Sequence, residues 1–223
     1  MTVTRNILIF CDFDGTVAKM DVGYNFFRHF SDGKSMELIP DWKSGKISSR
    51  ECLMQEAAMV KATPDEIYNY LDRFEIDPGF PEFVELCRRN NTRPVILSDG
   101  FDFYIKYILK KNNLAHLPVY CNRAHLENRT IRVEFPYENH YCERCGNCKG
   151  ERIAEIRSRS ENPFRTVFIG DGLSDTCAVG ETDLLFAKKD LELYCLENNI
   201  PYNKYVDFYD VARTLVAGGH LVE

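Results

Sequence analysis

The chain has 223 residues, which is enough for one large domain or for a core with a modest insertion. Hydrophobic residues make up 44% and charged residues 28%, so the composition supports a packed core and argues against disorder. The formal net charge is -6 and there is no long basic run, which disfavours nucleic acid and anionic membranes as partners; a small anionic substrate remains open, because a local site can be positive.

The apolar segments are short, and the cysteines are numerous. No apolar run approaches the roughly 20 residues that span a bilayer. The run at 7–10, near the N-terminus, is shorter than a secretory signal needs, so we expect a cytoplasmic protein. Its nine cysteines should then be mostly free thiols. Five of them are predicted to be small core residues: Cys11, Cys52, Cys87, Cys177 and Cys195.

Strand-like and helix-like patterns alternate along most of the chain, which predicts an α/β fold with a parallel sheet. Short β-type runs are expected at residues 6–11, 94–97, 117–121, 166–169 and 184–187. Helices are expected between them at residues 80–90, 101–111, 149–157, 174–179, 191–198 and 208–216. Ligands bind at the carboxyl edge of such sheets. The polar residues that follow three of the strands should therefore meet there: Asp12, Asp14 and Thr16; Ser98 and Asp99; Asp171 and Asp175.

Two stretches interrupt this alternation. Residues 19–78 are mostly helical in pattern, with helices expected at 22–30, 36–43, 48–60 and 64–74; the last begins at a capping box, Thr63-Pro64-Asp65-Glu66. We expect this insertion to be a cap over the sheet edge that excludes water, with the core formed by 1–18 and 79–223. Residues 122–148 are expected to form a small flap, with a β-hairpin of 124–126 and 130–135 joined through 127–129.

Asp12 and Asp14 follow the first strand, two residues apart. Their carboxylates should face one crevice, and their repulsion calls for a cation or a shared proton. Magnesium prefers oxygen ligands and often pairs with substrate phosphate, and Asp171 at another strand end would complete its site. We therefore expect Asp12 to attack phosphorus as a covalent nucleophile and Asp14 to act as the general acid and base.

A structural interpretation of the same segment stays open, because Asp-x-Asp is also typical of turns and helix N-termini. The surrounding residues favour chemistry. Gly15 permits a tight turn beside a ligand, and Thr16 offers a hydroxyl group.

Ser98 ends the second core strand. Its hydroxyl and the backbone N–H groups of Asp99 and Gly100 can hold a phosphate oxygen, or Ser98 can cap the helix that starts near Phe101. Lys149 opens a helix, where its charge opposes the helix dipole. This indicates a lysine that points toward a phosphate, although a solvated lysine fits the sequence as well.

Asp171 and Asp175 lie four residues apart, across a loop and the start of a helix. Both can face the crevice, one as a direct metal ligand and one as a residue that supports it. The alternative is that they only cap the helix.

The order of these motifs resembles the haloacid dehalogenase superfamily of phosphatases: Asp12-Phe13-Asp14-Gly15-Thr16, then Ser98, then Lys149, then Gly170-Asp171-Gly172 with Asp175. The resemblance covers the whole chain and implies a Rossmann-like, doubly wound core that uses Mg²⁺. It implies these roles: Asp12 as nucleophile, Asp14 as general acid/base and main-chain metal ligand, Ser98 and Lys149 as phosphate ligands, and Asp171 and Asp175 as magnesium carboxylates. The second aspartate, Asp14, argues for a phosphatase, because dehalogenases of the superfamily lack it.

The helical insertion directly after the first motif resembles the phosphoserine-phosphatase-like branch. The segments 97–103 and 145–150 are similar to two groups within it: the hydroxy-ketomethylthiopentenyl-phosphate phosphatases of methionine salvage, and the phosphoethanolamine/phosphocholine phosphatases. Gly15 stands where phosphoserine phosphatases usually have serine, which argues against phosphoserine as the substrate. Asp21, shortly after the first motif, is expected to contact the leaving group together with Tyr24 and Asn25.

His140, Cys142, Cys145 and Cys148 form an H-x-C-x-x-C-x-x-C pattern. This spacing suits a structural Zn²⁺ or an iron–sulfur cluster that pins the flap and aims Lys149. Free thiols packed in the flap remain the alternative.

The function predicted from these residues is magnesium-dependent hydrolysis of a small phosphorylated metabolite through an aspartyl-phosphate. A phosphotransferase or phosphomutase would share this chemistry, whereas a receiver domain would lack the helical insertion and the second carboxylate. A metal-binding or redox module built on the cysteines would leave the carboxylates unexplained. The expected assembly is a monomer or a homodimer.

Overall fold

The computed structural model describes residues 7–137, 139–159 and 164–223. Asn6, the predicted start of the first strand, lies outside these residues. One sheet has the strand order β4-β3-β2-β1-β5-β6-β7. Its strands are β1 (Ile7–Cys11), β2 (Pro94–Phe101), β3 (Val119–Glu127), β4 (Thr130–Glu134), β5 (Arg165–Gly170), β6 (Leu184–Ala187) and β7 (Asn203–Lys204).

The predicted α/β class is confirmed, because every strand pair is parallel except β3 with β4. Side chains alternate between the two faces, as the pleat requires. In β1, Ile7, Ile9 and Cys11 join one apolar cluster, whereas Phe10 and Leu8 join the other. β1 pairs with β2 on one side and with β5 on the other, so the strand order reverses beside it. Ligands bind at such a switch point in doubly wound sheets.

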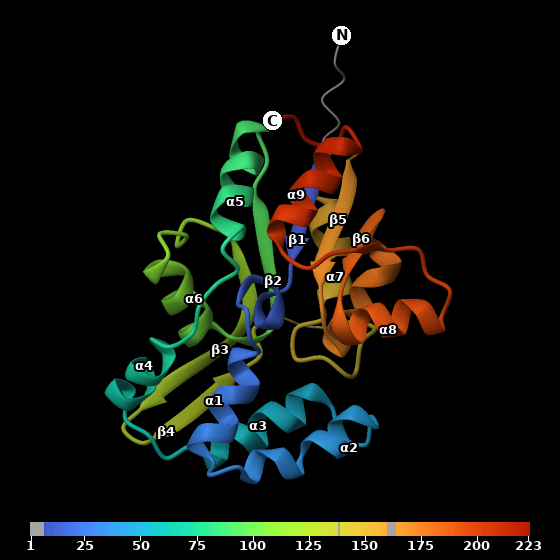
Figure 1. Cartoon of the computed structure of the whole chain (residues 1–223). Coiled ribbons are helices and arrows are strands. Elements are labelled where there is room, and N and C mark those ends of the chain that lie inside the picture. The colour runs from blue at the N-terminus through green and yellow to red at the C-terminus, as the bar shows by residue number, and fades with distance from the viewer. Residues whose placement is uncertain (1–6, 138, 160–163) are drawn as a thin grey trace.

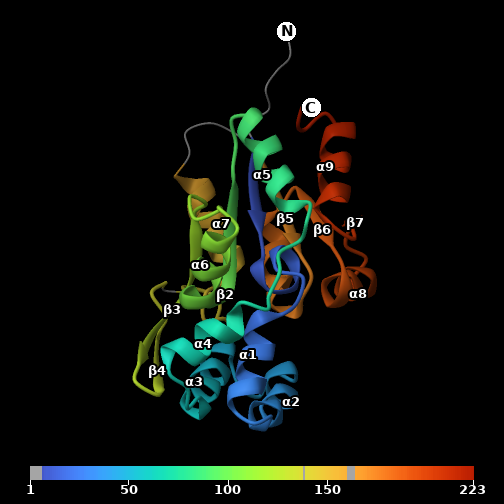
Figure 2. The same ribbon diagram turned by 60° about the vertical axis from the view of Figure 1, so that its left-hand side comes forward.

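Helices cover both faces of the sheet (Figures 1 and 2). The cluster that contains Ile9 also contains apolar residues of α5 (Phe80–Arg89), α6 (Asp102–Lys111) and α9 (Phe208–Ala217). The cluster that contains Phe10 takes residues from α7 (Lys149–Ser158), α8 (Lys189–Glu197) and the 3₁₀ helix η3 (Leu173–Glu181). The strand β7 was not predicted from the sequence, because two residues are too few to show an alternation of apolar and polar side chains.

The insertion after β1 is helical, with α1 (Val22–Phe30), the 3₁₀ helix η2 (Lys34–Glu37), α2 (Ile39–Lys43), α3 (Ser49–Met59) and α4 (Pro64–Leu71). The capping box of Thr63 and Glu66 is present. The helix expected at 36–43 is broken instead, because Pro40 lacks an N–H group and starts a new helix. Figure 1 shows α1, α2 and α3 beyond the sheet edge that lies opposite the C-terminus. The division into a core of 1–18 and 79–223 and a cap of 19–78 stays a prediction.

The flap differs from its prediction. The expected strand at 117–121 and the first hairpin strand at 124–126 are one continuous strand, β3, which pairs with β2 and then turns back into β4. The hairpin closes at the pair Glu127–Thr130, and Asn128 takes a left-handed φ of 51°, which asparagine tolerates better than most residues. Of the helices built from the residues described above, none is long and apolar enough to cross a membrane.

Candidate active site

Asp12 follows the last residue of β1 and therefore lies at the carboxyl edge of the sheet. Its backbone N–H donates to the carbonyl of Ile169 at 2.9 Å, which continues the pairing of β1 with β5. The chain then leaves the strand through a tight helical turn, η1 (Phe13–Val17), in which Gly15 has a φ of 78°. A Cβ atom on Gly15 would lie 2.3 Å from a carboxylate oxygen of Asp171. Glycine is therefore required here by both the backbone conformation and the close approach.

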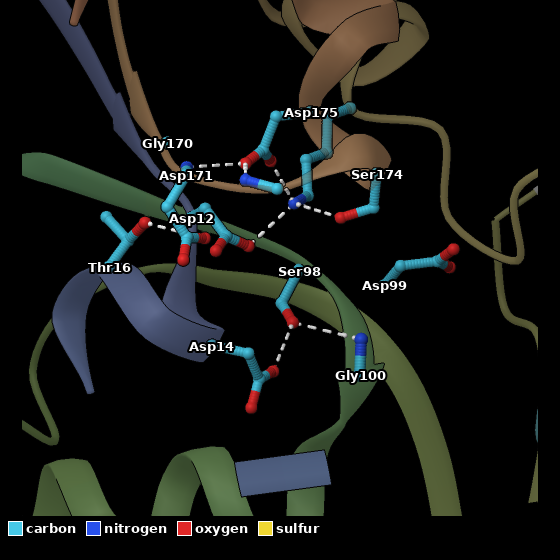
Figure 3. Close-up of polar contacts among 12 residues, drawn as sticks. Asp12, Asp14, Thr16, Ser98, Asp99, Gly100, Gly170, Asp171, Ser174 and Asp175 are labelled. Atoms are coloured by element: carbon cyan, nitrogen blue, oxygen red, sulfur yellow. Dashed lines mark hydrogen bonds and ion pairs between the residues drawn. The ribbon is translucent and has the colours of Figure 1, made fainter. Parts of the chain in front are cut away.

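Three buried carboxylates gather at this edge, and a buried lysine lies among them. Asp12, Asp171 and Asp175 each place one oxygen within 4.8 Å of the others (Figure 3). Lys149 is 1% exposed; its Nζ donates to Asp12 Oδ1 at 2.6 Å and forms an ion pair with Asp175. The alternative of a solvated Lys149 is therefore wrong. Residues from three separate parts of the sequence meet here: Asp12 and Asp171 because parallel strands end at one edge, with Asp175 in the same loop as Asp171, and Lys149 at the start of α7.

Burial and crowding set the charges in this group. Burial raises the pKa of Asp12 well above its usual range, the charge of Asp175 adds to this, and the Lys149 ammonium opposes it. Burial alone would lower the pKa of Lys149, but the charges of Asp12 and Asp175 outweigh it and hold that pKa well above its ordinary value. Lys149 is thus a permanent cation that partly compensates three crowded acids.

Asp171 and Asp175 have different surroundings. Asp171 accepts from Lys189 Nζ at 2.7 Å and from Thr16 Oγ1 at 3.4 Å. Asp175 uses Oδ2 to accept the backbone N–H groups of Asp171 and Gly172, both at 2.9 Å, and its other oxygen faces Lys149. The Asp175 carboxylate therefore has both predicted roles. It accepts hydrogen bonds from the backbone at the start of η3, and it belongs to the group of three acids.

Asp14 belongs to a second network. Its Oδ1 accepts the backbone N–H groups of Val22 at 2.9 Å and Gly23 at 3.1 Å, in the first turn of α1. Its Oδ2 accepts from Tyr104 OH at 2.8 Å. The same oxygen accepts from Ser98 Oγ at 3.4 Å (Figure 3). Burial raises the pKa of Asp14, and the hydrogen bonds from Tyr104 and the two amides lower it. Its carboxylate is not part of the group of three acids, and the expected role of its main-chain carbonyl as a metal ligand stays a prediction.

Tyr104 is a site residue that the sequence analysis missed. It is 1% exposed and stands on α6, with its hydroxyl on Asp14. A Cβ atom on Gly100 would lie 1.7 Å from the Tyr104 hydroxyl oxygen and 3.0 Å from Asp14 Oδ2. Gly100 was predicted to bind phosphate. In the structure, its lack of a side chain leaves room for the Tyr104 phenol.

Ser98 and Asp99 lie in β2 where its pairing with β3 shifts register, between Leu97 and Phe101. Ser98 is 1% exposed, and its Oγ accepts the N–H of Gly100 at 2.9 Å. The capping alternative for Ser98 is wrong, because α6 begins at Asp102 with Phe101 at its N-cap. The Asp99 carboxylate accepts from the N–H of Asn147 at 2.7 Å, and burial raises its pKa to about 6.

Figure 3 shows the Asp99 side chain pointing away from Asp12 and Asp14. Asn122 Nδ2 donates to both the Asp99 carbonyl, at 2.6 Å, and its carboxylate, at 3.1 Å. The carboxylate therefore ties β2 to the flap, and a negative group would repel phosphate. The expectation that Asp99 binds phosphate is thus limited to its backbone N–H.

A pocket of about 490 Å³ opens above these residues. Its lower wall includes Asp12, Asp14 and Ser98, and its upper wall comes from the helical insertion: Asp21, Gly23, Tyr24, Phe27, Ile39, Trp42, Lys43, Ser49, Cys52, Leu53 and Glu56. Asp21 caps α1, where its Oδ1 accepts the N–H of Tyr24 at 2.7 Å, and it lines the pocket as a substrate contact must. Asn25 is absent from the lining, and its side-chain amide donates to the Asp21 carbonyl at 2.6 Å.

Glu56 is a second residue that the sequence analysis missed. It lines the same pocket from α3 and is only 5% exposed. Burial raises its pKa to about 8, and the charge of Asp21 adds to this shift. The upper wall thus combines two acids with aromatic and apolar side chains.

The cysteine run is only partly as predicted. Cys142, Cys145 and Cys148 place their Sγ atoms within 4.8 Å of one another. The imidazole of His140 does not belong to this group. His140 is exposed, its backbone N–H donates to Glu151, and its ring packs edge-on to Tyr141.

The strand order and the helical insertion define a haloacid dehalogenase-like fold, with the acid–lysine group at its β1 edge. Solved structures agree on the fold. "Phospho-Aspartyl Intermediate Analogue of Phosphoserine phosphatase" matches with a TM-score of 0.71 and 18% identity, over 96% of this chain and 99% of that one. "Crystal structure of had family hydrolase t0658" from Salmonella enterica matches with a TM-score of 0.75 and 17% identity, over 95% and 70%.

The chain belongs to the family described as "Putative Phosphatase", whose model matches residues 7–206. A Bacillus cereus protein named "2-hydroxy-3-keto-5-methylthiopentenyl-1-phosphate phosphatase" is 32% identical over 222 residues, 98% of each chain. A protein of the same name from Bacillus cytotoxicus is 31% identical over 222 residues, again 98% of each chain. The predicted kind of enzyme, a phosphoric monoester hydrolase, is confirmed.

Proposed function

We propose that the protein hydrolyses the phosphate monoester of a small metabolite through a phosphoaspartyl intermediate on Asp12. The observation that carries this proposal is the contact of Asp12 with Lys149 at 2.6 Å inside the group that includes Asp171 and Asp175. A buried carboxylate at the pocket floor, beside a fixed cation, is placed to meet a phosphate.

The donor set of this group fits Mg²⁺, which takes oxygen ligands and is commonly held by one or two carboxylates together with substrate phosphate. Asp12 and Asp171 would hold the ion, with Asp175 supporting them. When bound, Mg²⁺ would offset the negative charge of the phosphate and of the crowded acids.

In the first step, a carboxylate oxygen of Asp12 forms a bond to phosphorus while the bond from phosphorus to the leaving oxygen breaks. Asp14 donates its proton to that leaving oxygen. In the second step, Asp14 takes a proton from water, whose oxygen attacks phosphorus, and the bond to Asp12 breaks. The buried position that raises the pKa of Asp14 favours the protonated acid needed first. Ser98 and Lys149 hold the phosphate oxygens.

For the leaving group, we propose the compound named in the relatives, 2-hydroxy-3-keto-5-methylthiopentenyl-1-phosphate, which belongs to methionine salvage. Its name describes a carbon chain with hydroxyl and keto groups and a methylthio end. Phe27, Trp42 and Leu53 in the upper wall offer apolar surface to such an end. When ionised, Asp21 and Glu56 would repel a leaving group with a carboxylate, such as phosphoserine, although Lys43 also lines the pocket.

A second candidate follows from the two acids in the upper wall. Asp21 and Glu56, with Tyr24 and Trp42 nearby in the lining, fit an ammonium group as found in phosphoethanolamine or phosphocholine. If this candidate is right, Glu56→Gln raises KM for the ammonium-bearing esters and leaves KM for a neutral ester unchanged.

The test is phosphate release from a panel of small phosphate esters, with and without Mg²⁺ and without any acceptor other than water. We expect release to require Mg²⁺ and to disappear in Asp12→Asn, whose far-UV spectrum should match that of the wild type. Release that needs an added acceptor alcohol would instead point to a phosphotransferase or phosphomutase. Full activity of Asp12→Asn would overturn the mechanism. The cytoplasmic compartment and the monomeric or dimeric state stay predictions.

A further inference from the structure

The thiols beside the active site include one that the sequence pattern did not contain. The thiols of Cys145 and Cys148 interact with the thiol of Cys177, whose Sγ also donates to the Ser174 carbonyl at 3.6 Å. Cys177 lies in η3, which follows β5 in the sequence, and it is half-buried. It was expected to be a small core residue, and that interpretation is wrong, because its Sγ faces the cysteine run.

We propose that four thiols form a structural Zn²⁺ site: Cys142, Cys145, Cys148 and Cys177. Cys177 takes the place that the sequence pattern had assigned to His140. The ion would join the loop that precedes α7 to the helix η3.

The thiol geometry is close to what zinc needs. Zn–S bonds of about 2.3 Å in a tetrahedral site require S···S distances of about 3.8 Å. The three thiols of the run already lie within 4.8 Å of one another. Cys177 interacts with two of them but lies outside that group of three, so its side chain would have to turn toward the run to complete the site. All four are free thiols, so no disulfide competes among them. An all-sulfur tetrahedral set selects zinc or iron–sulfur centres. Four cysteines are also a common ligand set of structural zinc sites.

The backbone around the run is held in place by groups outside the thiols. Glu151 accepts the backbone N–H groups of His140 at 2.6 Å, Tyr141 at 2.9 Å and Cys142 at 2.7 Å. Asn139 donates to the Cys145 carbonyl at 2.7 Å and accepts the Cys148 N–H at 3.1 Å. The loop is therefore arranged around the thiols before any ion binds, as the partners of a metal site commonly are.

The two segments that the ion would join already touch. A Cβ atom on Gly150 would lie 2.1 Å from the carbonyl oxygen of Cys177, so the start of α7 rests directly on η3. Lys149 follows Cys148 in sequence, and Asp175 precedes Cys177 by two residues. The zinc site would thus brace both partners of the buried Lys149–Asp175 ion pair. We infer that the four cysteines act as positioning residues for Lys149.

The test is the metal content of protein expressed with added zinc and purified under reducing conditions without chelator. We expect one zinc per chain by mass spectrometry of the metals. Cys177→Ser should weaken zinc binding at least tenfold in competition with a chromophoric chelator. Two control variants should keep one zinc with wild-type affinity: His140→Ala and Cys195→Ser. Cys195 is a buried thiol that lies outside the cluster.

A zinc-free wild type, iron with acid-labile sulfide, or zinc lost in His140→Ala but kept in Cys177→Ser would each overturn the proposal. If Cys177→Ser does not fold, wild-type protein loaded with Co²⁺ decides instead. Tetrahedral all-thiolate Co²⁺ gives intense sulfur-to-metal charge-transfer bands and strong visible bands, and their absence would also reject the site. Asp12→Asn should retain its zinc, so a failure of the proposed hydrolysis and a failure of the zinc site can be told apart.

Discussion

Replacing Lys149 by methionine tests whether its ammonium stabilises the buried carboxylates of the site. The change keeps a long side chain of similar bulk and removes only the ammonium. In the wild type, this ammonium is 1% exposed, lies 2.6 Å from Asp12 and pairs with Asp175, and both carboxylates are buried as well. Methionine would leave two buried carboxylates next to Asp171 without their cation. Removing one partner of a buried ion pair costs about 3–5 kcal/mol of unfolding free energy.

The assay is urea unfolding at pH 8 without added Mg²⁺, for the wild type and Lys149→Met. The matched control is Lys189→Met, because Lys189 also pairs with a site carboxylate, Asp171, at 2.7 Å. The side chain of Lys189 is 54% exposed, so its ion pair is screened by water and should be worth less than about 1 kcal/mol.

The pH dependence gives a second check on the same variant. Without Lys149, the crowded acids hold their protons more tightly in the folded state than in the unfolded one. The loss in Lys149→Met should therefore shrink as the pH is lowered, because Asp12 and Asp175 then take up protons and lose their charge. Equal losses for Lys149→Met and Lys189→Met, or a loss that does not depend on pH, would refute the assigned role of the buried cation.

Three further predictions concern the pocket. Asp14→Asn should lower kcat by about 10²–10⁴ in a steady-state phosphate-release assay, and an unchanged kcat would rule out proton transfer by Asp14. Tyr104→Phe removes a donor that lowers the pKa of Asp14, so the pH–rate limb that reports Asp14 should move to higher pH; a limb that stays in place would contradict the contact at 2.8 Å. Burial raises the pKa of Glu56 from 4.5 to about 8, so the folded state holds its proton more tightly than the unfolded state. Wild-type unfolding free energy should therefore fall between these pH values, and Glu56→Gln should gain a few kcal/mol at pH 9 in urea unfolding, whereas parallel curves would argue against a buried acid.

The residues at the sheet edge could be predicted because their positions follow from periodicity alone. Runs of apolar residues fix where β1 and β5 end, and parallel strands end on one side. Asp12 and Asp171 therefore had to meet, whatever the details of packing. Lys149 was predictable only in combination with them, because a lysine at a helix start has no distinguishing pattern of its own.

Residues fixed by tertiary packing could not be predicted. Tyr104 and Glu56 are single side chains on helices, and nothing in their local sequence tells that one faces Asp14 and the other a pocket. Asp12 and Asp14 line one pocket, as expected, but their separation into two hydrogen-bond networks was not predicted, for a related reason. Residues two apart share a face only in an extended strand. The chain leaves β1 at Asp12 and turns through Gly15, so the two carboxylates enter different networks.

The continuity of β3 was hidden by one polar residue. Asn122 is buried, and in the sequence it reads as a loop between two apolar stretches. Inside the strand, its amide nitrogen donates two hydrogen bonds to Asp99 on the neighbouring strand, whereas its side-chain oxygen is buried without a partner among the described residues. The partner of the amide nitrogen is remote in sequence, so the sequence pattern could not show that a polar residue would be held there.

The contacts of Asp171 and Asp175 separate two roles that their sequence spacing left open. Both oxygens of Asp175 are committed, one to two backbone N–H groups of its own loop and the other to Lys149. Within the part of the chain that the structure describes, the Asp171 carboxylate makes only a long contact with Thr16 and an ion pair with the half-exposed Lys189, which can swing into solvent. Asp171 can therefore turn an oxygen to a cation at little cost. Asp175 cannot do so without releasing the loop and the lysine, and it acts by holding Lys149 beside Asp12.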